Sequence, residues 1–210
     1  MPIADQRLIF IGGGGFAREC FDWANNSKEG LVPFGYLDDA GETQLSAPPY
    51  SLSYLGAITD YVPEQKDRFV FAIGSPSLKE KLSHLISNSF NFVNLTHVSA
   101  TVSPSAKLGK GAVICPFALI SSSTNIGDFV TINAYSSIGH DSKVGDFSTL
   151  SGHVDLTGNC RVGKGVFWGS GSRALPNSIV EDYAVVGAGS QVIKRLKKNL
   201  TLYAPFSKKL

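Results

Sequence analysis

The fold is decided by the segment TINAYSSIGHDSKV, residues 131–144, in which Ile132, Ile138 and Val144 recur every six positions. The same step of six, extended in both directions, meets an apolar residue at all sixteen positions from Val102 to Val192. With 43% of the chain apolar, independent placement would give this result with a chance of roughly 10⁻⁶. Neither the 3.6-residue helix period nor the two-residue strand period explains it. The segment therefore consists of hexapeptide repeats.

A second column supports the repeat. The residue four places after each apolar position is small or β-branched throughout, from Ala106 to Ser190. A narrow coil that takes one large and one small inward side chain per short strand needs this pattern, with Gly, Asn or Asp at many corners. The spacing predicts a parallel β-helix.

The first 95 residues follow a different pattern, in which strands alternate with helices. This order predicts a small parallel α/β sheet. The expected strands are 8–11, 34–37 and 69–73, and the expected helices are 16–24 and 78–86. The composition changes between Leu95 and Ser103, so we expect two domains, residues 1–95 and 96–210.

A glycine-rich turn between the first strand and first helix reads Gly12-x-Gly14-x-x-Ala17, and Asp38 follows about 20 residues later. This is the dinucleotide fingerprint in its usual context, where backbone N–H groups hold phosphates. The alternative is that the glycines only permit close packing of the strand and helix. Fewer than 100 residues form one mononucleotide-binding half, which favours a nucleotide or nucleotide-sugar over a whole NAD.

One histidine of the repeats stands beside an acid. His140 lies two places after Ile138, so it points outward near a corner, and Asp141 follows it. An imidazole held by a carboxylate is a base suited to neutral pH, although a solvated surface histidine is the alternative. His153 has no such neighbour and is expected to be structural or to border the same groove.

Charge and cysteine content exclude several classes. The net charge is +2 and no long block of like charge is present, so neither nucleic acid nor a membrane is an expected partner. Three scattered cysteines suit buried thiols in a reducing compartment, and no metal site is expected. No basic-then-apolar leader and no long apolar stretch are seen, so we expect a soluble, cytoplasmic protein.

The repeat resembles the left-handed β-helix acyltransferases, in which three hexapeptides form one triangular coil. That likeness implies the handedness and about five coils between residues 102 and 197. The whole chain resembles bacterial sugar acetyltransferases that join a small nucleotide-binding domain to such a helix, including UDP-4-amino-sugar N-acetyltransferases and sialic-acid O-acetyltransferase-like proteins. The matching motifs are Leu37-Asp38-Asp39, Ala72-Ile73-Gly74, Val93-Asn94-Leu95, Ser103-Pro104-Ser105-Ala106, Asn133 ahead of His140-Asp141, and Gly158-Asn159.

The resemblance implies the catalytic residues. His140 would be the general base, Asp141 would raise its basicity and Asn133 would support the site. Coils of eighteen residues stack Gly158 over His140, and its N–H would steady the oxyanion of acyl transfer. Relatives often carry His-Gly where this chain has Phe16-Ala17.

Two further sets of residues follow from the resemblance. Acetyl-CoA would lie in a groove between subunits of a homotrimer, near Thr149, Gly158, Ser170 and Ala188; the donor-binding histidine of some relatives falls at Thr149. The nucleotide-sugar would contact Gly14, Gly15, Phe16, Asp38, Asp39, Gly74 and Ser77.

The expected function is acetyl-CoA-dependent N-acetylation of the amine of a nucleotide-activated (UDP-, dTDP- or GDP-) amino-deoxy sugar in glycan biosynthesis. Three alternatives stay open: O-acetylation of sialic acid or a related sugar hydroxyl, a zinc hydratase like the γ-class carbonic anhydrases, and a silent nucleotide-binding scaffold. The hydratase needs three histidines across an interface, and only His140 and His153 lie in the repeats. The cations Lys194, Arg195, Lys197 and Lys198 would meet coenzyme A phosphates or form a solvated cap.

Overall fold

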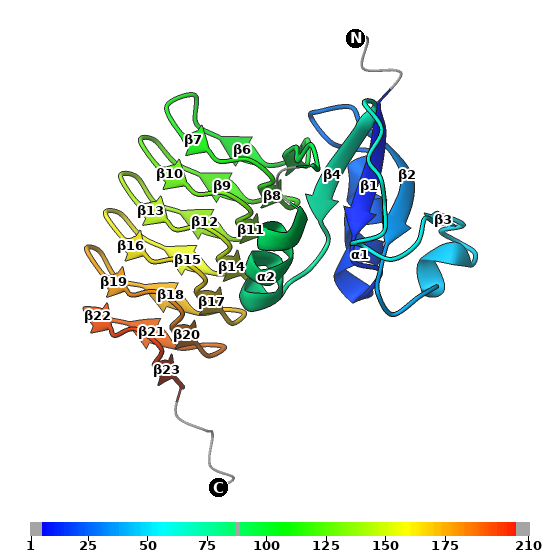
Figure 1. Ribbon diagram of the computed structural model, residues 1–210. Coiled ribbons are helices and arrows are strands. Elements are labelled where there is room, and N and C mark those ends of the chain that lie inside the picture. The colour runs from blue at the N-terminus through cyan, green and yellow to red at the C-terminus, as the bar shows by residue number, and fades with distance from the viewer. Residues whose placement is uncertain (1–5, 87–88, 205–210) are drawn as a thin grey trace, which may run out of the picture.

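The computed structural model describes residues 6–86 and 89–204 of the chain. It has two parts, an N-terminal α/β domain and a parallel β-helix, with helix α2 (Pro76–Ile86) lying between them (Figure 1). The predicted fold, a small parallel sheet followed by a left-handed β-helix, is confirmed.

The β-helix has three faces of parallel strands, which we name after the first strand of each. The β5 face contains β5 (Leu95–Thr96), β8 (Val113–Ile114), β11 (Thr131–Ile132), β14 (Thr149–Leu150), β17 (Phe167–Trp168), β20 (Val185–Val186) and β23 (Thr201–Leu202). The β6 face contains β6 (Thr101–Val102), β9 (Leu119–Ile120), β12 (Ser137–Ile138), β15 (Asp155–Leu156), β18 (Arg173–Ala174) and β21 (Gln191–Val192). The β7 face contains β7 (Lys107–Leu108), β10 (Asn125–Ile126), β13 (Lys143–Val144), β16 (Arg161–Val162), β19 (Ile179–Val180) and β22 (Arg195–Leu196).

The inside of the coil is filled as the two columns predict. From Ile114 to Val192 every residue of the large apolar column is buried, and Trp168 is fully enclosed. The small column is also buried from Ala112 to Ser190, and its serines have a second role. The Ser136 hydroxyl donates to Ser151 O at 2.9 Å and accepts from the Val154 N–H at 3.1 Å, so it connects neighbouring coils. Serine therefore suits both the narrow space and the unpaired backbone groups of the corners.

The β-helix is longer than the sequence estimate. Strand β5 pairs with β8 and strand β23 pairs with β20, so the coils extend from Leu95 to Leu202 and number six, with one strand over. The step of eighteen residues holds up to Val192. It then shortens to sixteen, because Leu196 pairs with Val180. The apolar column misses the first strand because its inward position, six residues before Val102, is Thr96, and it misses the last strands because the last coil departs from the hexapeptide spacing.

Aromatic residues occupy several corners at which Gly, Asn or Asp was expected. Phe129, Tyr135 and Phe147 have φ between 58° and 62°, a region that bulky residues rarely adopt. Each ring stacks on an equivalent ring one coil away: Phe129 and Phe147 have centroids 5.3 Å apart. Stacking between coils offsets the local strain of the corner.

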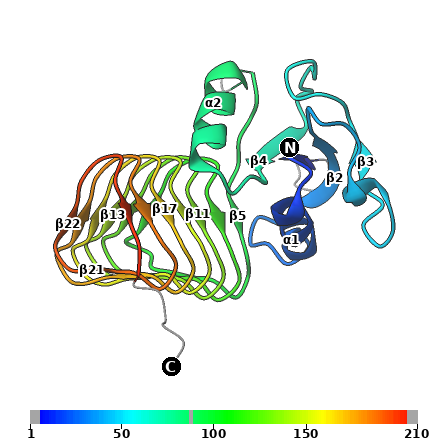
Figure 2. The same cartoon turned by 90° about the horizontal axis from the view of Figure 1, so that it is seen from below.

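The N-terminal sheet has the order β3-β2-β1-β4 and all its strands are parallel. Its strands are β1 (Arg7–Ile11), β2 (Val32–Leu37), β3 (Ser53–Tyr54) and β4 (Asp67–Phe71). Helix α1 (Gly15–Ala24) covers one side of the sheet and α2 covers the other, as Figure 2 shows. The three predicted strands and two predicted helices are confirmed, whereas β3 and a 3₁₀ turn (Gln44–Ser46) carry no periodic signal.

Helix α2 attaches the N-terminal domain to the β-helix. Lys79 on this helix is fully buried, and its Nζ donates to Phe129 O at 2.8 Å and to the Thr131 hydroxyl at 3.0 Å. Lys164 forms a salt bridge with Glu80 at 2.6 Å. Burial lowers the pKa of the Lys79 ammonium to about 7. These contacts place the chain that precedes α2 over the β5 face.

Candidate active site

Two adjoining cavities of about 560 Å³ each lie beside helix α1. The first, the loop cavity, is bordered by the glycine turn, and the second, the junction cavity, lies between the N-terminal domain and the β5 face. Both are lined by Phe16, Gly74 and Ser75, so a single ligand can extend from one into the other. Their volume is in the range of small-molecule sites.

The loop cavity contains most of the predicted nucleotide-sugar residues. Its lining includes Gly14, Gly15, Phe16, Asp38, Asp39 and Gly74. Gly14 is the N-cap residue of α1 and provides no side-chain cap, and the Gly15 and Phe16 N–H groups donate to no acceptor within residues 6–86 and 89–204. Free N–H groups at a helix start favour an anion.

The two aspartates also hold the loops of this cavity in place. Asp38 accepts from the Gly13 N–H at 2.7 Å and from the Ala40 N–H at 2.9 Å. Asp39 accepts from the Ile58 N–H at 2.8 Å. One role of the Asp-Asp pair is therefore to connect three loops, and the remaining acceptor capacity of each carboxylate faces the cavity.

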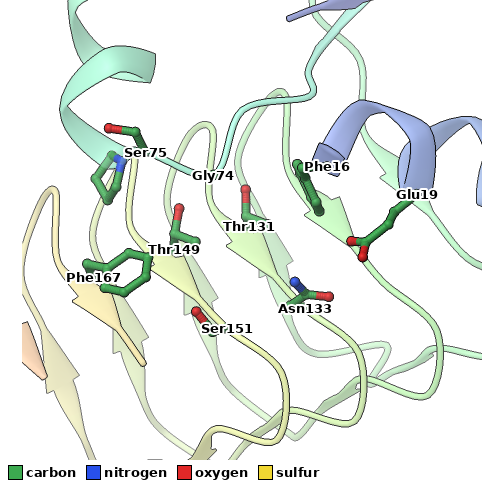
Figure 3. Close-up of a pocket in the computed structure, with 10 residues that line it drawn as sticks. Phe16, Glu19, Gly74, Ser75, Thr131, Asn133, Thr149, Ser151 and Phe167 are labelled. Atoms are coloured by element: carbon green, nitrogen blue, oxygen red, sulfur yellow. The ribbon is translucent and has the colours of Figure 1, made fainter. Parts of the chain in front are cut away.

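The junction cavity is floored by the β-helix at an eighteen-residue spacing (Figure 3). Thr131, Thr149 and Phe167 come from successive strands β11, β14 and β17, and Asn133 and Ser151 follow the first two. Its other walls are Gly74 and Ser75 before α2, Pro76 at the start of α2, and Phe16 and Glu19 on α1.

His140 lies on a different edge of the β-helix. We name two edges after their residues: the Asn133 edge follows the β5-face strands, and the His140 edge follows the β6-face strands. His140 Nδ1 lies 2.8 Å from Asp141 Oδ2, and both side chains are more than half exposed. Strand β12 lies between the two edges and keeps them apart. Within one chain, therefore, neither His140 nor Asp141 lines either cavity.

Gly158 stacks on His140, as expected. A Cβ added at Gly158 would lie 2.5 Å from His140 Nε2, so the imidazole occupies the space that a side chain would take. The Gly158 N–H donates to no acceptor in the described ranges. A base and an open backbone donor therefore stand side by side on this edge.

The remaining predicted residues lie as follows. Thr149 faces the junction cavity beneath the N-terminal domain, where its side chain is buried. Ser170 and Ala188 follow strands β17 and β20 and continue the Asn133 edge. The Ser77 hydroxyl pairs with that of Ser75 at 3.1 Å and lines neither cavity.

Several lining residues were missed by the sequence reasoning. Thr131 and Phe167 stand eighteen residues before and after Thr149, so the coil length alone could have identified them. Glu19 lies one helical turn after Gly15, on the face of α1 that meets the cavity. Lys79 carried no signal, because its burial arises only when α2 packs on the β-helix.

Other predicted features have local partners. The His153 ring stacks on Tyr135 with centroids 5.1 Å apart. Arg195 donates to Glu181 at 2.7 Å, which places one of the four C-terminal cations in a contact within the last coil. All three cysteines are buried and free.

Residues 6–86 and 89–204 hold neither a candidate metal cluster nor a helix that could span a membrane. No group of three or more His, Cys, Asp or Glu residues could hold a metal ion there. In the same ranges, each helix is too short or too polar to traverse a lipid bilayer.

Comparisons with known proteins agree with this architecture. Residues 7–86 match the family model of the PglD N-terminal domain. The chain is similar to PerB from Caulobacter crescentus, solved in complex with CoA and GDP-perosamine, with 28% identity, a TM-score of 0.83, and 92% of each chain covered.

Two further structures share the fold at lower identity. The acetyltransferase domain of PglB from Neisseria gonorrhoeae FA1090, in complex with acetyl coenzyme A, is 24% identical with a TM-score of 0.84 over 93% of this chain and 95% of that one. WeeI from Acinetobacter baumannii AYE is 23% identical with a TM-score of 0.71 over the same shares of the two chains. The chain thus joins a region that matches the PglD N-terminal domain to a set of hexapeptide coils, and it is similar to PerB over nearly its full length.

Proposed function

We propose that this protein is an acetyl-CoA-dependent N-acetyltransferase that acts on the amine of a nucleotide-linked amino sugar. The observation that carries the proposal is the continuity of the two cavities through Phe16, Gly74 and Ser75. The loop cavity offers free N–H groups to a diphosphate, and the junction cavity offers hydroxyl and amide groups to a sugar. PerB, which is similar over 92% of this chain, was solved with CoA and GDP-perosamine.

The chemistry is assigned to the His140 edge. His140 Nε2 accepts the proton that the amine loses as it attacks, while Asp141 holds the other ring nitrogen. The Gly158 N–H donates to the developing oxyanion. Acetyl-CoA supplies the acetyl group, and the leaving thiolate takes the proton from His140.

A second subunit completes the site in this proposal. Asn133 lines the junction cavity, whereas His140 lies on the next edge of the same chain. Adjacent subunits of a homotrimer would set the His140 edge of one copy against the Asn133 edge of the other. Exposed aromatic rings along the Asn133 edge, Phe117 and Tyr135, supply an apolar surface for that contact. Coenzyme A would lie between the copies, near Thr149, Ser170 and Ala188.

The primary test is release of coenzyme A thiol from acetyl-CoA at a pH of about 7.5, above the reference histidine pKa. The acceptors are GDP-perosamine and a UDP-4-amino-4,6-dideoxy sugar, each beside its counterpart with a hydroxyl in place of the amine. We expect release with an amine acceptor and a loss of about 10²–10⁴-fold in His140→Ala. Release with the hydroxyl counterparts alone would establish O-acetylation instead.

Complementation tests the shared site. His140→Ala and Asn133→Ala are each expected to be nearly inactive alone. When the two are co-expressed in equal amounts, about a quarter of all sites in the randomly assembled trimers, one of the three in each mixed trimer, would join an intact Asn133 to an intact His140. Recovery of activity in that range supports a site between subunits. No recovery from verified mixed trimers would place both residues in a site within one chain.

A further inference from the structure

The junction cavity has a single charged side chain in its lining. Among its ten lining residues, Glu19 is the only one with an ionisable group. Its carboxylate has no hydrogen-bond or salt-bridge partner within residues 6–86 and 89–204, whereas the neighbouring Arg18 donates to Gln44 at 2.6 Å. Figure 3 shows the Glu19 carboxylate turned toward the cavity on the side of Asn133, across from Phe167. The cavity therefore carries one free negative charge.

A second, independent feature of the same cavity also calls for a ligand. Thr149 is only 4% exposed, and its hydroxyl has no hydrogen-bond partner in the described part of the chain. Native proteins leave few buried hydroxyls unpaired, because the loss of hydration is costly. Thr131 nearby differs, since its hydroxyl accepts from Lys79. Thr149 thus has free hydrogen-bonding capacity at the wall that faces Glu19.

We propose that Glu19 makes this enzyme selective for an acceptor that carries an amine, by pairing with the ammonium group of the sugar in the junction cavity. The inference rests on the proposed function and adds the residue that separates an amine from a hydroxyl acceptor. A primary amine on a sugar is largely protonated near neutral pH, and an opposite charge within a few ångströms stabilises that form. A hydroxyl in the same place gains nothing from the charge.

The position of Glu19 suits this role. Gly15 begins α1 beside the loop cavity, and Glu19 stands one turn further along the same helix, beside the junction cavity. A ligand whose diphosphate meets the helix start would therefore carry its sugar toward Glu19. The helix fixes this offset, because one turn rises about 5.4 Å.

The reaction remains balanced with this capture step. The bound ammonium loses one proton to solvent before attack, and the neutral amine then forms the C–N bond while the C–S bond of the thioester breaks. The second amine proton passes through His140 to the coenzyme A thiolate. Glu19 orients the cation and is a specificity residue in this scheme; it exchanges no proton with the reacting atoms.

The test is a binding comparison in the absence of acetyl-CoA. Titration calorimetry measures the Kd of GDP-perosamine and of the GDP-6-deoxyhexose with a hydroxyl at the same position, and the corresponding UDP pair is measured alongside. Glu19→Gln removes the charge and keeps the shape. Asp22→Asn is the matched control, because Asp22 is an exposed acid on the same helix and lines neither cavity.

We expect Glu19→Gln to weaken the amine ligand by up to about fivefold, because Glu19 is exposed and exposed ion pairs contribute little, and to leave the hydroxyl ligand unchanged. Asp22→Asn should change neither, and Glu19→Asp should retain part of the preference. Added salt should reduce the amine preference of the wild type and have no such effect in Glu19→Gln.

The outcomes separate this inference from the function beneath it. If the wild type acetylates an amine acceptor but Glu19→Gln keeps the full preference for the amine ligand, the role of Glu19 is wrong and the proposed function stands. If the preference disappears in Glu19→Gln and the wild type still acetylates no amine, Glu19 binds an ammonium but the proposed reaction is wrong. If the wild type shows neither preference nor turnover, both are overturned.

Discussion

Replacement of Gly158 by alanine should displace the proposed base without unfolding the coil. The added Cβ would lie 2.5 Å from His140 Nε2 and 2.7 Å from Cε1, whereas ordinary contact begins near 3.4 Å. The ring must therefore withdraw by about 0.9 Å. Gly158 does not have a positive φ, so alanine fits its backbone. His140 is exposed and can move, which confines the damage to its position and to the 2.8 Å contact with Asp141.

A displacement of about 1 Å in a reacting group can reduce turnover by roughly 10²-fold. We expect a loss of this order in kcat for coenzyme A release, with little change in the KM of the nucleotide-sugar, because the loop cavity is on another part of the chain. The melting temperature should stay close to that of Gly152→Ala, a coil control in which the new methyl group meets only Ala134 O at 3.5 Å.

A double mutant decides whether the effect passes through the imidazole. In the His140→Ala background the alanine at position 158 has no ring to displace, so the second change should cost little more. Full activity of Gly158→Ala would refute the assigned geometry. A further large loss in the double mutant would show that Gly158 acts through its own N–H or through the acyl donor.

Two further predictions concern stability. Lys79→Met should flatten the pH dependence of the free energy of unfolding between about pH 7 and 8.5. In the wild type, Lys79 stays charged across this range in the unfolded state but loses its proton in the folded state, where its pKa is about 7. The free energy of unfolding should therefore rise with pH by at most about 1.4 kcal/mol per pH unit. Above this range the buried Cys20, whose pKa is raised, makes the free energy of unfolding fall as the pH rises. Urea titrations at several pH values measure both slopes, and equal slopes would exclude a titrating Lys79. Trp168→Ala should lower the free energy of unfolding by about 3–5 kcal/mol, because Trp168 is fully buried in the coil. Trp168→Phe should cost less, and comparable losses in the two variants by circular dichroism would show that cavity volume is not the cause.

The β-helix was predictable because the residue at each position of its repeat follows one local rule. Every short strand needs a large inward residue and every corner needs a small inward residue, so the places of Ile132 and Ser136 can be predicted without knowledge of the rest of the fold. The ends were less predictable. Strand β5 keeps the spacing of six, but its inward residue is the polar Thr96, and Leu202 pairs with Val186 at a spacing of sixteen residues, so neither end continues the apolar column.

The site was only partly predictable, for a physical reason of the same kind. The glycine turn and the His140-Asp141 pair are each contiguous in the chain, so each can be recognised from a short stretch of sequence. Glu19 and Thr149 come together only because α2 anchors the N-terminal domain on the β-helix through the buried Lys79. Packing of one domain on the other brings together side chains that have no regular sequence spacing, and no sequence motif predicts such contacts.

The residues proposed to bind the acceptor and those proposed to carry out the reaction lie in different parts of the structure. The junction cavity takes Phe16 and Glu19 from one helix of the N-terminal domain and takes its floor from β-helix strands, whereas His140, Asp141 and Gly158 lie at corners of the β-helix that line neither cavity. A substitution on α1 can therefore change the acceptor that is held without disturbing the proposed base. The coil spacing fixes the base and its donor on stacked corners regardless of the acceptor. One chain keeps these two parts on different edges, and we propose that the assembly of subunits joins them. Assembly is therefore a requirement for activity.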